Sequence, residues 1–353
     1  MESIYEVISR ITPPDGTALA EASARWDQLA KPLGSLGVLE DQIAKISALQ
    51  GEIQPEISRR TLLVFCADNG VVAQGVSQCG SAVTASVAEA LAEQRSTVNP
   101  MARIAGCKVL PVDMGMFDFP GKIGVENQRV RNGTADISLG PAMMREECLE
   151  AMARGAAVAG RLAGEGERML LIGEMGIGNT TTAAAVTAAL LGLSPEKAAG
   201  RGAGLSDEGL RRKYSVIKNA LSVNRPNTDD PVDVLTKVGG LDLAGMCGAF
   251  LGAAACGTAV IIDGMISAVA ALCAFRLCPS AKKAMLASHI SAEPAGEALI
   301  RGLGLQAPIR AGLRLGEGSG AVALLPLLDM AMSVYKSGQT FERLGIEAYT
   351  RQD

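Results

Sequence analysis

The sequence predicts an α/β protein, in which a doubly wound and mostly parallel sheet carries a small helical subdomain built from both ends of the chain. Short apolar runs that finish in a polar residue next to glycine recur along the chain, and helix-like segments separate them. Both ends of the chain have the pattern of amphipathic helices. Aromatic residues are only 3% of the 353 residues while glycine occurs 41 times, a balance that suits helices packed closely on a sheet.

The two ends of the chain predict helices. Apolar residues recur at helical spacing in three segments of the first 50 residues, which read EVISRI, ALAEASARWDQLA and LGVLEDQIAKISALQ. A long apolar helix followed by a polar tail is expected over residues 319–345. We expect these ends to meet in a small helical domain of residues 1–54 plus 319–353, beside a large domain of residues 55–318.

The central part predicts parallel strands that helices cover on both faces, because each apolar run is nearly continuous. The runs are TLLVFCADNG (61–70), KVLPVDMG (108–115), RMLLIGEMG (168–176), TAVIIDG (258–264) and AMLASHIS (284–291). An open sheet of this Rossmann-like kind binds ligands beyond the carboxyl ends of its strands. The residues expected along that edge are Asp68, Asp113, Glu174, Asp263 and His289. For any single aspartate the alternative is a turn or helix cap.

The stretch Leu243–Ile262 is long enough for a membrane span, since its 20 residues carry no charge. Alanine and glycine dominate it, however, and its end reads as a strand bounded by turns. We therefore predict a buried helix followed by a buried strand, and no membrane span. The first residues, MESIYEVISRITPP, lack the basic and apolar parts of a secretory signal.

Charge and cysteine usage limit the partners. The net charge is −4 and no lysine- or arginine-rich run creates the basic stripe expected of a nucleic-acid binder, which argues against a nucleic-acid partner. The eight cysteines are scattered without C-x-x-C pairs, which indicates reduced thiols in a cytoplasmic protein. His289 is the only histidine, so neither a zinc site nor a nucleophilic triad is expected, and His289 itself is interpreted as a partly buried structural residue.

The segment MLLIGEMGIGNTTTAAAV (169–186) predicts an anion site, because an apolar strand ends in a glycine loop that opens into a helix. The spacing from Gly173 to Gly178 imitates a P-loop, but Asn179 stands where its lysine would be. This favours a monophosphate over a nucleoside triphosphate. The alternative is a glycine turn that serves only the packing of helix on sheet.

Two more segments could carry chemistry. In LRLGEGSGAVALLPLLDMA (313–331), Glu317 lies between two glycines at a helix entrance, a place suited to a general base or, alternatively, to an anionic helix cap. In AGRGAGLSDEGLRRKYSVI (199–217), Lys213 lies on a helix that starts near Ser206. Lys213 could reach an anionic substrate or be a solvated surface charge.

Nine ordered blocks resemble the nicotinate-nucleotide:5,6-dimethylbenzimidazole phosphoribosyltransferase family of cobalamin biosynthesis. They are KPLGSLGVLE (31–40), ADNGVV (67–72), VTAS (83–86), GPAM (140–143), GEMGIGNTTTAAA (173–185), VGGLDLAGM (238–246), IIDG (261–264), SHISAE (288–293) and LRLGEGSGAVALLP (313–326). The resemblance implies a parallel sheet with a helical subdomain, a homodimer, and transfer of phosphoribose from nicotinate mononucleotide to a benzimidazole nitrogen. The products would be an α-riboside 5′-phosphate and nicotinate, with no metal or organic cofactor.

The resemblance also implies roles for single residues. Glu317 would be the general base, Glu174 would assist it from across the pocket, and Lys213 would stabilise negative charge electrostatically. The residues expected to bind substrate are Gly176, Ile177, Gly178, Asn179, Thr180, Gly202, Asp263, Ser291, Leu315 and Val87. Of these, the loop 176–180 with Gly202 and Ser291 would hold the phosphate.

The chain departs from the family pattern at two positions near the expected pocket. Asn69 stands where the family often has histidine, and Val87 where a glutamine near the acceptor base is expected. The segment 75–91 also lacks the usual proline-containing turn. These departures favour considering another benzimidazole, a purine or a phenolic acceptor. A non-catalytic nucleotide-binding regulator is the alternative from another class, and Glu317 and Glu174 argue against it.

Overall fold

The computed structural model describes residues 2–350 and contains a six-stranded sheet in which all strands are parallel. The strand order is β3-β2-β1-β4-β5-β6. The strands are β1 (Arg60–Ala67), β2 (Lys108–Gly115), β3 (Glu126–Asn127), β4 (Met169–Met175), β5 (Ala259–Ile262) and β6 (Met285–Ala287). The predicted α/β fold and its five apolar strands are confirmed, whereas the two-residue edge strand β3 was not predicted.

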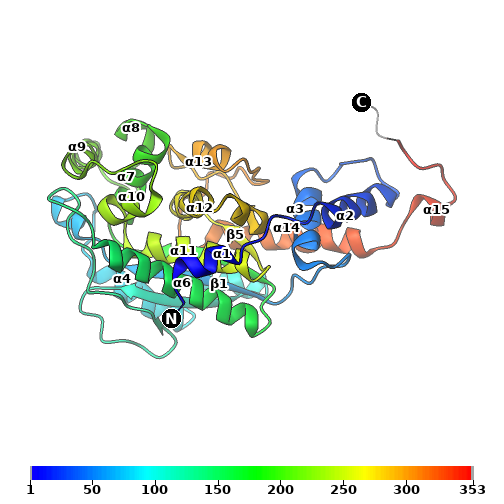
Figure 1. Ribbon diagram of the computed structural model, residues 1–353, viewed down its shortest axis with the longest axis horizontal. Helices are drawn as coiled ribbons and strands as arrows, with labels where there is room; N and C mark the ends of the chain where they lie inside the picture. Colours follow the sequence, from blue (N-terminus) through cyan, green and yellow to red (C-terminus); the bar gives the residue numbers. More distant parts are fainter. Residues whose placement is uncertain (1, 351–353) are drawn as a thin grey trace.

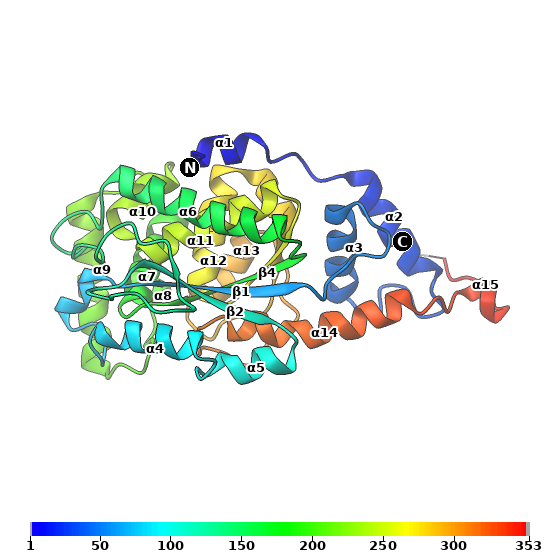
Figure 2. The same ribbon diagram turned by 90° about the horizontal axis from the view of Figure 1, so that it is seen from below.

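Helices cover both faces of this sheet. They are α1 (Ile4–Ser9), α2 (Gly16–Gln28), α3 (Val38–Gln50), α4 (Ala82–Ala92), α5 (Val98–Ile104), α6 (Arg145–Gly164), α7 (Asn179–Leu191), α8 (Pro195–Ala198), α9 (Asp207–Asn224), α10 (Pro231–Val238), α11 (Leu241–Ala255), α12 (Met265–Leu277), α13 (Gly296–Gly302), α14 (Ser319–Lys336) and α15 (Phe341–Leu344), with short 3₁₀ turns η1 (Gly70–Gln74) and η2 (Pro279–Ala284). Figure 2 shows α4, α5 and α14 on one side of β1 and β2, and α6, α11 and α12 on the other.

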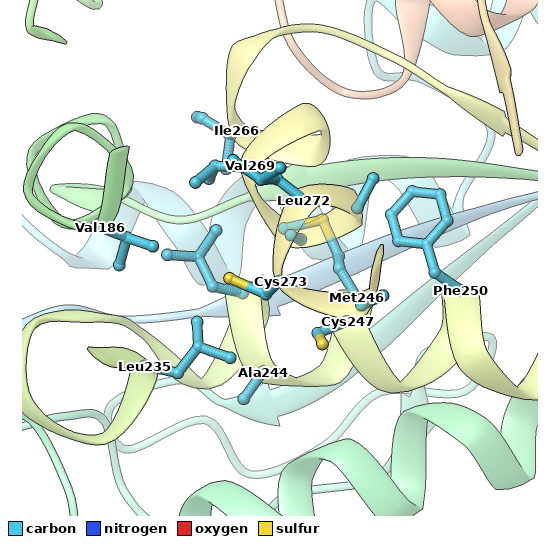
Figure 3. Packing of buried hydrophobic residues seen from close by; sticks show 14 of the residues in the cluster. Val186, Leu235, Ala244, Met246, Cys247, Phe250, Ile266, Val269, Leu272 and Cys273 are labelled. Atoms are coloured by element: carbon cyan, nitrogen blue, oxygen red, sulfur yellow. The ribbon is translucent and has the colours of Figure 1, made fainter. Parts of the chain in front are cut away.

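The two sides of the sheet bury separate apolar clusters, because successive residues of a strand point to opposite faces. Leu63 and Phe65 of β1 belong to the cluster under α6 and α11, while Leu62 and Val64 belong to the cluster on the α5 and α14 side. Figure 3 shows part of the first cluster, in which Phe250 of α11 is among the labelled residues. Two hydrophobic layers thus hold the sheet in place and leave only its ends for a ligand.

Glycine lets α6 and α11 approach closely. A Cβ on Gly155 of α6 would lie 1.9 Å from the carbonyl oxygen of Gly245, and one on Gly248 would lie 1.8 Å from that of Met152. This contact explains the composition of the uncharged stretch Leu243–Ile262, which forms most of α11 and then β5, as predicted. Among the described residues, no helix combines the length and hydropathy needed to cross a membrane.

The two ends of the chain meet beside the sheet, where α3 packs on α2 and on α14, and α15 lies further out, at the right of Figure 1. Trp26 of α2 packs on Tyr335 of α14 with ring centroids 4.8 Å apart, and the Trp26 indole donates to the carbonyl of Glu40 at 3.1 Å. The backbone N–H of Ala30 donates to the carbonyl of Gln339 at 2.8 Å. The first helix differs from its neighbours, since α1 packs on α6 and α11.

Candidate active site

A cavity of about 320 Å³ opens beyond the carboxyl ends of the strands. Its lining includes residues that follow β4, β5 and β6, beside the point between β1 and β4 where the order of the strands reverses, as expected for an open α/β sheet. Of the five residues expected on this edge, Glu174, Asp263 and His289 line the cavity.

Asp113 fulfils the alternative role and binds the backbone of its own turn, whereas Asp68 binds groups that lie far along the chain. The Asp113 carboxylate accepts the N–H groups of Gly115 and Met116, each at 2.9 Å. The Asp68 carboxylate accepts the Phe117 N–H at 2.8 Å and the hydroxyl of Thr84 at 2.6 Å. These two carboxylates therefore shape the turns after β1 and β2 and do not face the cavity.

The loop Gly176–Thr180 lines the cavity along its whole length, as expected. Gly178 has a φ of +91° and ends the loop where α7 begins, a backbone conformation that favours glycine. The N–H groups of Ile177 and Asn179 are already bonded, to the Thr84 hydroxyl and the Gly176 carbonyl. Within residues 2–350, those of Gly178 and Thr180 have no protein acceptor. Two donors at a helix N-terminus are thus available to an anion.

Lys213 lies directly behind this loop. Its side chain is fully buried, so the alternative of a solvated surface charge is wrong. The ammonium donates to Thr180 Oγ1 at 2.8 Å and to the Gly200 carbonyl at 3.2 Å. Burial lowers the pKa of Lys213 to about 8, while the Glu293 carboxylate opposes that change. Lys213 therefore orients the loop and places a cation behind it.

Gly202 and Ser291 complete this side of the cavity. Gly202 has a φ of +53°, and a Cβ there would lie 2.9 Å from Thr180 Oγ1, so glycine is needed for the close approach. Gly202 therefore lies beside the loop 176–180, and Ser291 lines the same cavity. These are the two residues expected to help the loop hold a phosphate.

Glu317 stands in the turn before α14 and lines the cavity. It adopts the left-handed region with a φ of +57°, and its Oε2 accepts the N–H of Val98 at 3.1 Å. The side chain is half-buried. The alternative role of capping α14 belongs to Asp263, whose Oδ1 accepts the N–H groups of Gly320 and Ala321 at 2.7 and 3.0 Å.

Glu174 is the deeply buried carboxyl of the cavity, only 8% exposed. Burial raises its pKa to about 8, nearby carboxylates add to the rise, and the Asn179 amide opposes it. Its Oε1 lies 2.6 Å from where a Cβ of Gly316 would stand, so the glycine beside Glu317 makes room for it. The two glutamates expected to share the chemistry therefore meet in one cavity.

Asp263 and His289 form a coupled buried pair on the far wall. Burial raises the pKa of Asp263 and lowers that of His289, while the charge of each opposes the change in the other. The ring of His289 abuts Gly320, where a Cβ would lie 2.0 Å from Nδ1, and Nδ1 is 3.0 Å from Ser288 Oγ. His289 is thus buried and hydrogen-bonded, as interpreted from the sequence.

An apolar wall faces these polar groups. It includes the two residues expected at the acceptor, Val87 and Leu315, together with Val83 and Met175. Leu315 is 49% exposed, and α4 presents Val83 and Val87. A flat aromatic ring fits such a wall, since apolar and aromatic ligand groups are usually held by apolar side chains.

Sequence reasoning missed several residues of the site. Arg201, Glu293 and Arg314 line the cavity, and Asp242 lies beneath it in contact with Asn179. Asp242 is fully buried, and its signal was visible as a lone charge within the apolar run VGGLDLAGM. For Arg201, Glu293 and Arg314, charged residues in loops, no local pattern distinguishes a cavity wall from a solvated surface.

A model of a phosphoribosyltransferase family matches residues 11–346. A nicotinate-nucleotide–dimethylbenzimidazole phosphoribosyltransferase from Acetivibrio thermocellus is 44% identical over 328 residues, which cover 93% of each chain. One from Ruminiclostridium cellulolyticum is 41% identical over 344 residues, or 98% of each chain. The crystal structure of CobT from Thermus thermophilus superposes with a TM-score of 0.89 at 38% identity, covering 94% of this chain and 100% of that one. The chain therefore belongs to this family of phosphoribosyltransferases.

Proposed function

We propose that the protein transfers phosphoribose from nicotinate mononucleotide to 5,6-dimethylbenzimidazole, a step of cobalamin biosynthesis. One observation carries the proposal. A helix N-terminus with two free N–H groups and a carboxylate in a glycine turn face the same cavity, and an apolar wall lies beside them. Relatives that match this chain over nearly their whole length are named for this activity.

The reaction needs one proton acceptor and one anchored phosphate. One ring nitrogen of the acceptor attacks C1′ of the ribose, and the bond from C1′ to the nicotinate nitrogen breaks with its electron pair left on that nitrogen. The proton on the other acceptor nitrogen passes to Glu317, whose carboxylate stands in the turn Gly316–Gly318. Attack from the face opposite the leaving group inverts C1′ and gives the α-riboside.

The phosphate would bind at the loop Gly176–Thr180. The free N–H groups of Gly178 and Thr180 and the positive end of the α7 dipole suit a dianion. Lys213 would act through Thr180, to which it is bonded, and would strengthen the positive potential at the loop. Ser291 and Gly202 border the same space.

The acceptor would lie against Val87 and Leu315, with its nitrogen toward Glu317. Val87 offers the ring no hydrogen bond, so recognition there rests on shape and apolar contact. Asn69 does not line the cavity: it is buried behind the loop 176–180, where its amide donates to the carbonyl of Ile177 at 3.5 Å. Of the two departures from the family pattern, Val87 is the one that would affect acceptor choice.

We also infer a homodimer with two domains per chain, as the family resemblance implies, and a cytoplasmic location, as the scattered cysteines indicate. The division into residues 55–318 and residues 1–54 plus 319–353 is supported by the joint packing of α2, α3 and the outer part of α14. Exposed apolar side chains on the helical end, among them Met330 and Leu344, are candidates for the contact between copies. Light scattering on the purified chain would give the mass of the particle.

The test of the function is product formation from nicotinate mononucleotide. The acceptors would be dimethylbenzimidazole, benzimidazole, adenine, phenol and p-cresol, with products separated by chromatography and identified by mass. We expect the dimethylbenzimidazole riboside phosphate as the main product. A purine or phenolic product in its place would move the acceptor to that class. Binding of nicotinate mononucleotide without any product would favour the regulator.

A further inference from the structure

Beneath the cavity, two buried carboxyl groups share one amide donor. Nδ2 of Asn179 donates to an oxygen of Glu174 and, at 3.2 Å, to Oδ2 of Asp242. Glu174 comes from the end of β4 and Asp242 from the first turn of α11, so the amide bridges two layers of the fold. The chain thus brings together two acids that lie 68 positions apart in the sequence.

The backbone around Asp242 is shaped to admit its carboxylate. A Cβ on Gly240 would lie 2.4 Å from Oδ1, and a Cβ on Gly176 would lie 3.1 Å from Oδ2. Oδ1 also accepts the N–H of Leu243 at 2.9 Å. Asp242 is fully buried and does not line the cavity, so it cannot touch a substrate there.

No cation neutralises these two acids. Within residues 2–350, neither Glu174 nor Asp242 has a lysine, arginine or histidine nitrogen within 4 Å. The other titratable groups that act on Glu174 are Asp263 after β5 and Glu317 before α14, and Asp68 acts on Asp242. All three are acids. The buried thiol of Cys66 on β1 is a further neighbour, since the charges of both carboxyl groups raise its pKa.

Two carboxyl groups this close, in a site without a counter-ion, do not both ionise easily, so the pair binds one proton. Burial raises the pKa of both carboxyl groups. Within residues 2–350, Asp242 accepts two N–H groups, from Leu243 and from Asn179, whereas Glu174 accepts only that of Asn179, so Asp242 is the better stabilised anion and the proton resides on Glu174.

We propose that Asp242 is a positioning residue: its buried carboxylate, joined to Glu174 through the Asn179 amide, keeps Glu174 protonated during the reaction. The inference rests on the proposed function and adds the protonation state of one of its residues. A neutral Glu174 has an O–H that can donate to the substrate, and it adds no negative charge beside the bound phosphate. Glu317, and not Glu174, is then the glutamate that accepts the proton of the incoming base.

The test is the pH dependence of kcat/KM for nicotinate mononucleotide in the full-length enzyme. Asp242→Asn keeps the shape and an acceptor oxygen for Asn179 but removes the charge. We expect the alkaline limb of its profile to move to lower pH by about half a unit or more, so that the rate at pH 9 falls about threefold beyond any change at pH 6.

A double-mutant cycle separates this effect from Lys213, which also titrates near pH 8. Glu174→Gln imitates the neutral acid, so we expect it to retain more activity than Glu174→Ala. In the Glu174→Gln background, Asp242→Asn should no longer move the alkaline limb. Asp113→Asn, at a buried strand-end carboxyl outside the cavity, is the matched control and should leave the limb in place.

The outcomes decide between separate claims. An inactive wild-type enzyme with every acceptor would overturn the proposed function. With an active wild type, an equal loss at all pH values in Asp242→Asn would reduce Asp242 to a structural residue and overturn the inference. Glu174→Gln as inactive as Glu174→Ala would show that Glu174 works as an anion, and would overturn it as well.

Discussion

The cavity is built from two glycine turns that start helices, and the two turns differ in what their N–H groups do. At the start of α7, the N–H groups of Gly178 and Thr180 have no acceptor among the residues that the structure describes, and Lys213 lies behind them. At the start of α14, the carboxylate of Asp263 already accepts the N–H groups of Gly320 and Ala321. The first helix can therefore attract an anion, whereas the second is already capped and has Glu317 in the turn before it.

A glycine-rich start of a helix therefore does not identify a phosphate site on its own. Both segments have a glutamate that follows a glycine and a further glycine directly before the helix. What separates them is a carboxylate from another strand, since Asp263 follows β5 and reaches the second turn only in the folded chain. The occupant of a helix N-terminus is decided by tertiary contacts.

The largest effect is expected at the second turn. Glu317→Ala should leave folding intact and lower kcat about a hundredfold or more, the scale of a lost general base. Glu317→Gly is the sharper variant, because glycine adopts the φ of +57° without strain. Both are checked by product chromatography at saturating substrate, with circular dichroism as the folding control. Wild-type turnover in either variant would remove Glu317 from the mechanism.

A smaller effect on activity is expected at the first turn. Lys213→Met keeps the volume of the side chain but removes the cation behind Thr180, so the KM for nicotinate mononucleotide should rise about 10- to 100-fold. Stability should fall little, because a buried ammonium is itself costly. The matched control is Lys218→Met, an exposed lysine further along α9, which should leave KM unchanged. An unchanged KM in Lys213→Met would argue against phosphate at this loop.

The sequence predicted these turns well because their signals are local. Patterns within short segments of the chain are enough to predict the strand ends, the glycines and Glu317. They also predict the start of the helix that carries Lys213. β3 escaped prediction because Glu126 and Asn127 form no apolar run and pair with β2 only at the sheet edge.

Through-space neighbours could not be predicted in the same way. Asp242 is 63 positions from Asn179, and Asp263 is 57 positions from Gly320, yet hydrogen bonds join both pairs. The sequence does not decide whether Lys213 is a surface charge or a residue of the site. Burial of a lysine depends on the helices that pack around it and not on its own segment. The local chemistry of the site was therefore legible in the sequence, and its electrostatics required the fold.

Asp263 caps the second turn. Removing this cap should lower the stability of the whole protein more than it disturbs the first turn. Asp263→Ala leaves two N–H groups of α14 unsatisfied in a buried place, so the free energy of unfolding should fall by about 1–2 kcal/mol. Asp263→Asn keeps an acceptor oxygen and should lose less. Urea titration of both variants measures the difference. Equal losses would mean that the carboxylate charge, and not the hydrogen bonds, holds the turn.

The smallest effect is a slope of stability with pH, and it links the two turns through Glu174. The folded protein holds a proton on Glu174 up to about pH 8, whereas the unfolded chain releases it near pH 4.5. Between these values the folded state binds more protons, so the free energy of unfolding should fall as pH rises, by at most about 1.4 kcal/mol per pH unit for one proton. Lys213 gives the opposite slope above pH 8, because its pKa is lowered on folding.

Urea titrations from pH 5 to 8 should show a flatter dependence of the free energy of unfolding on pH in Glu174→Gln than in wild type. Parallel curves would mean that Glu174 is ionised in the folded protein, and the two turns would then face a cavity with two anionic glutamates.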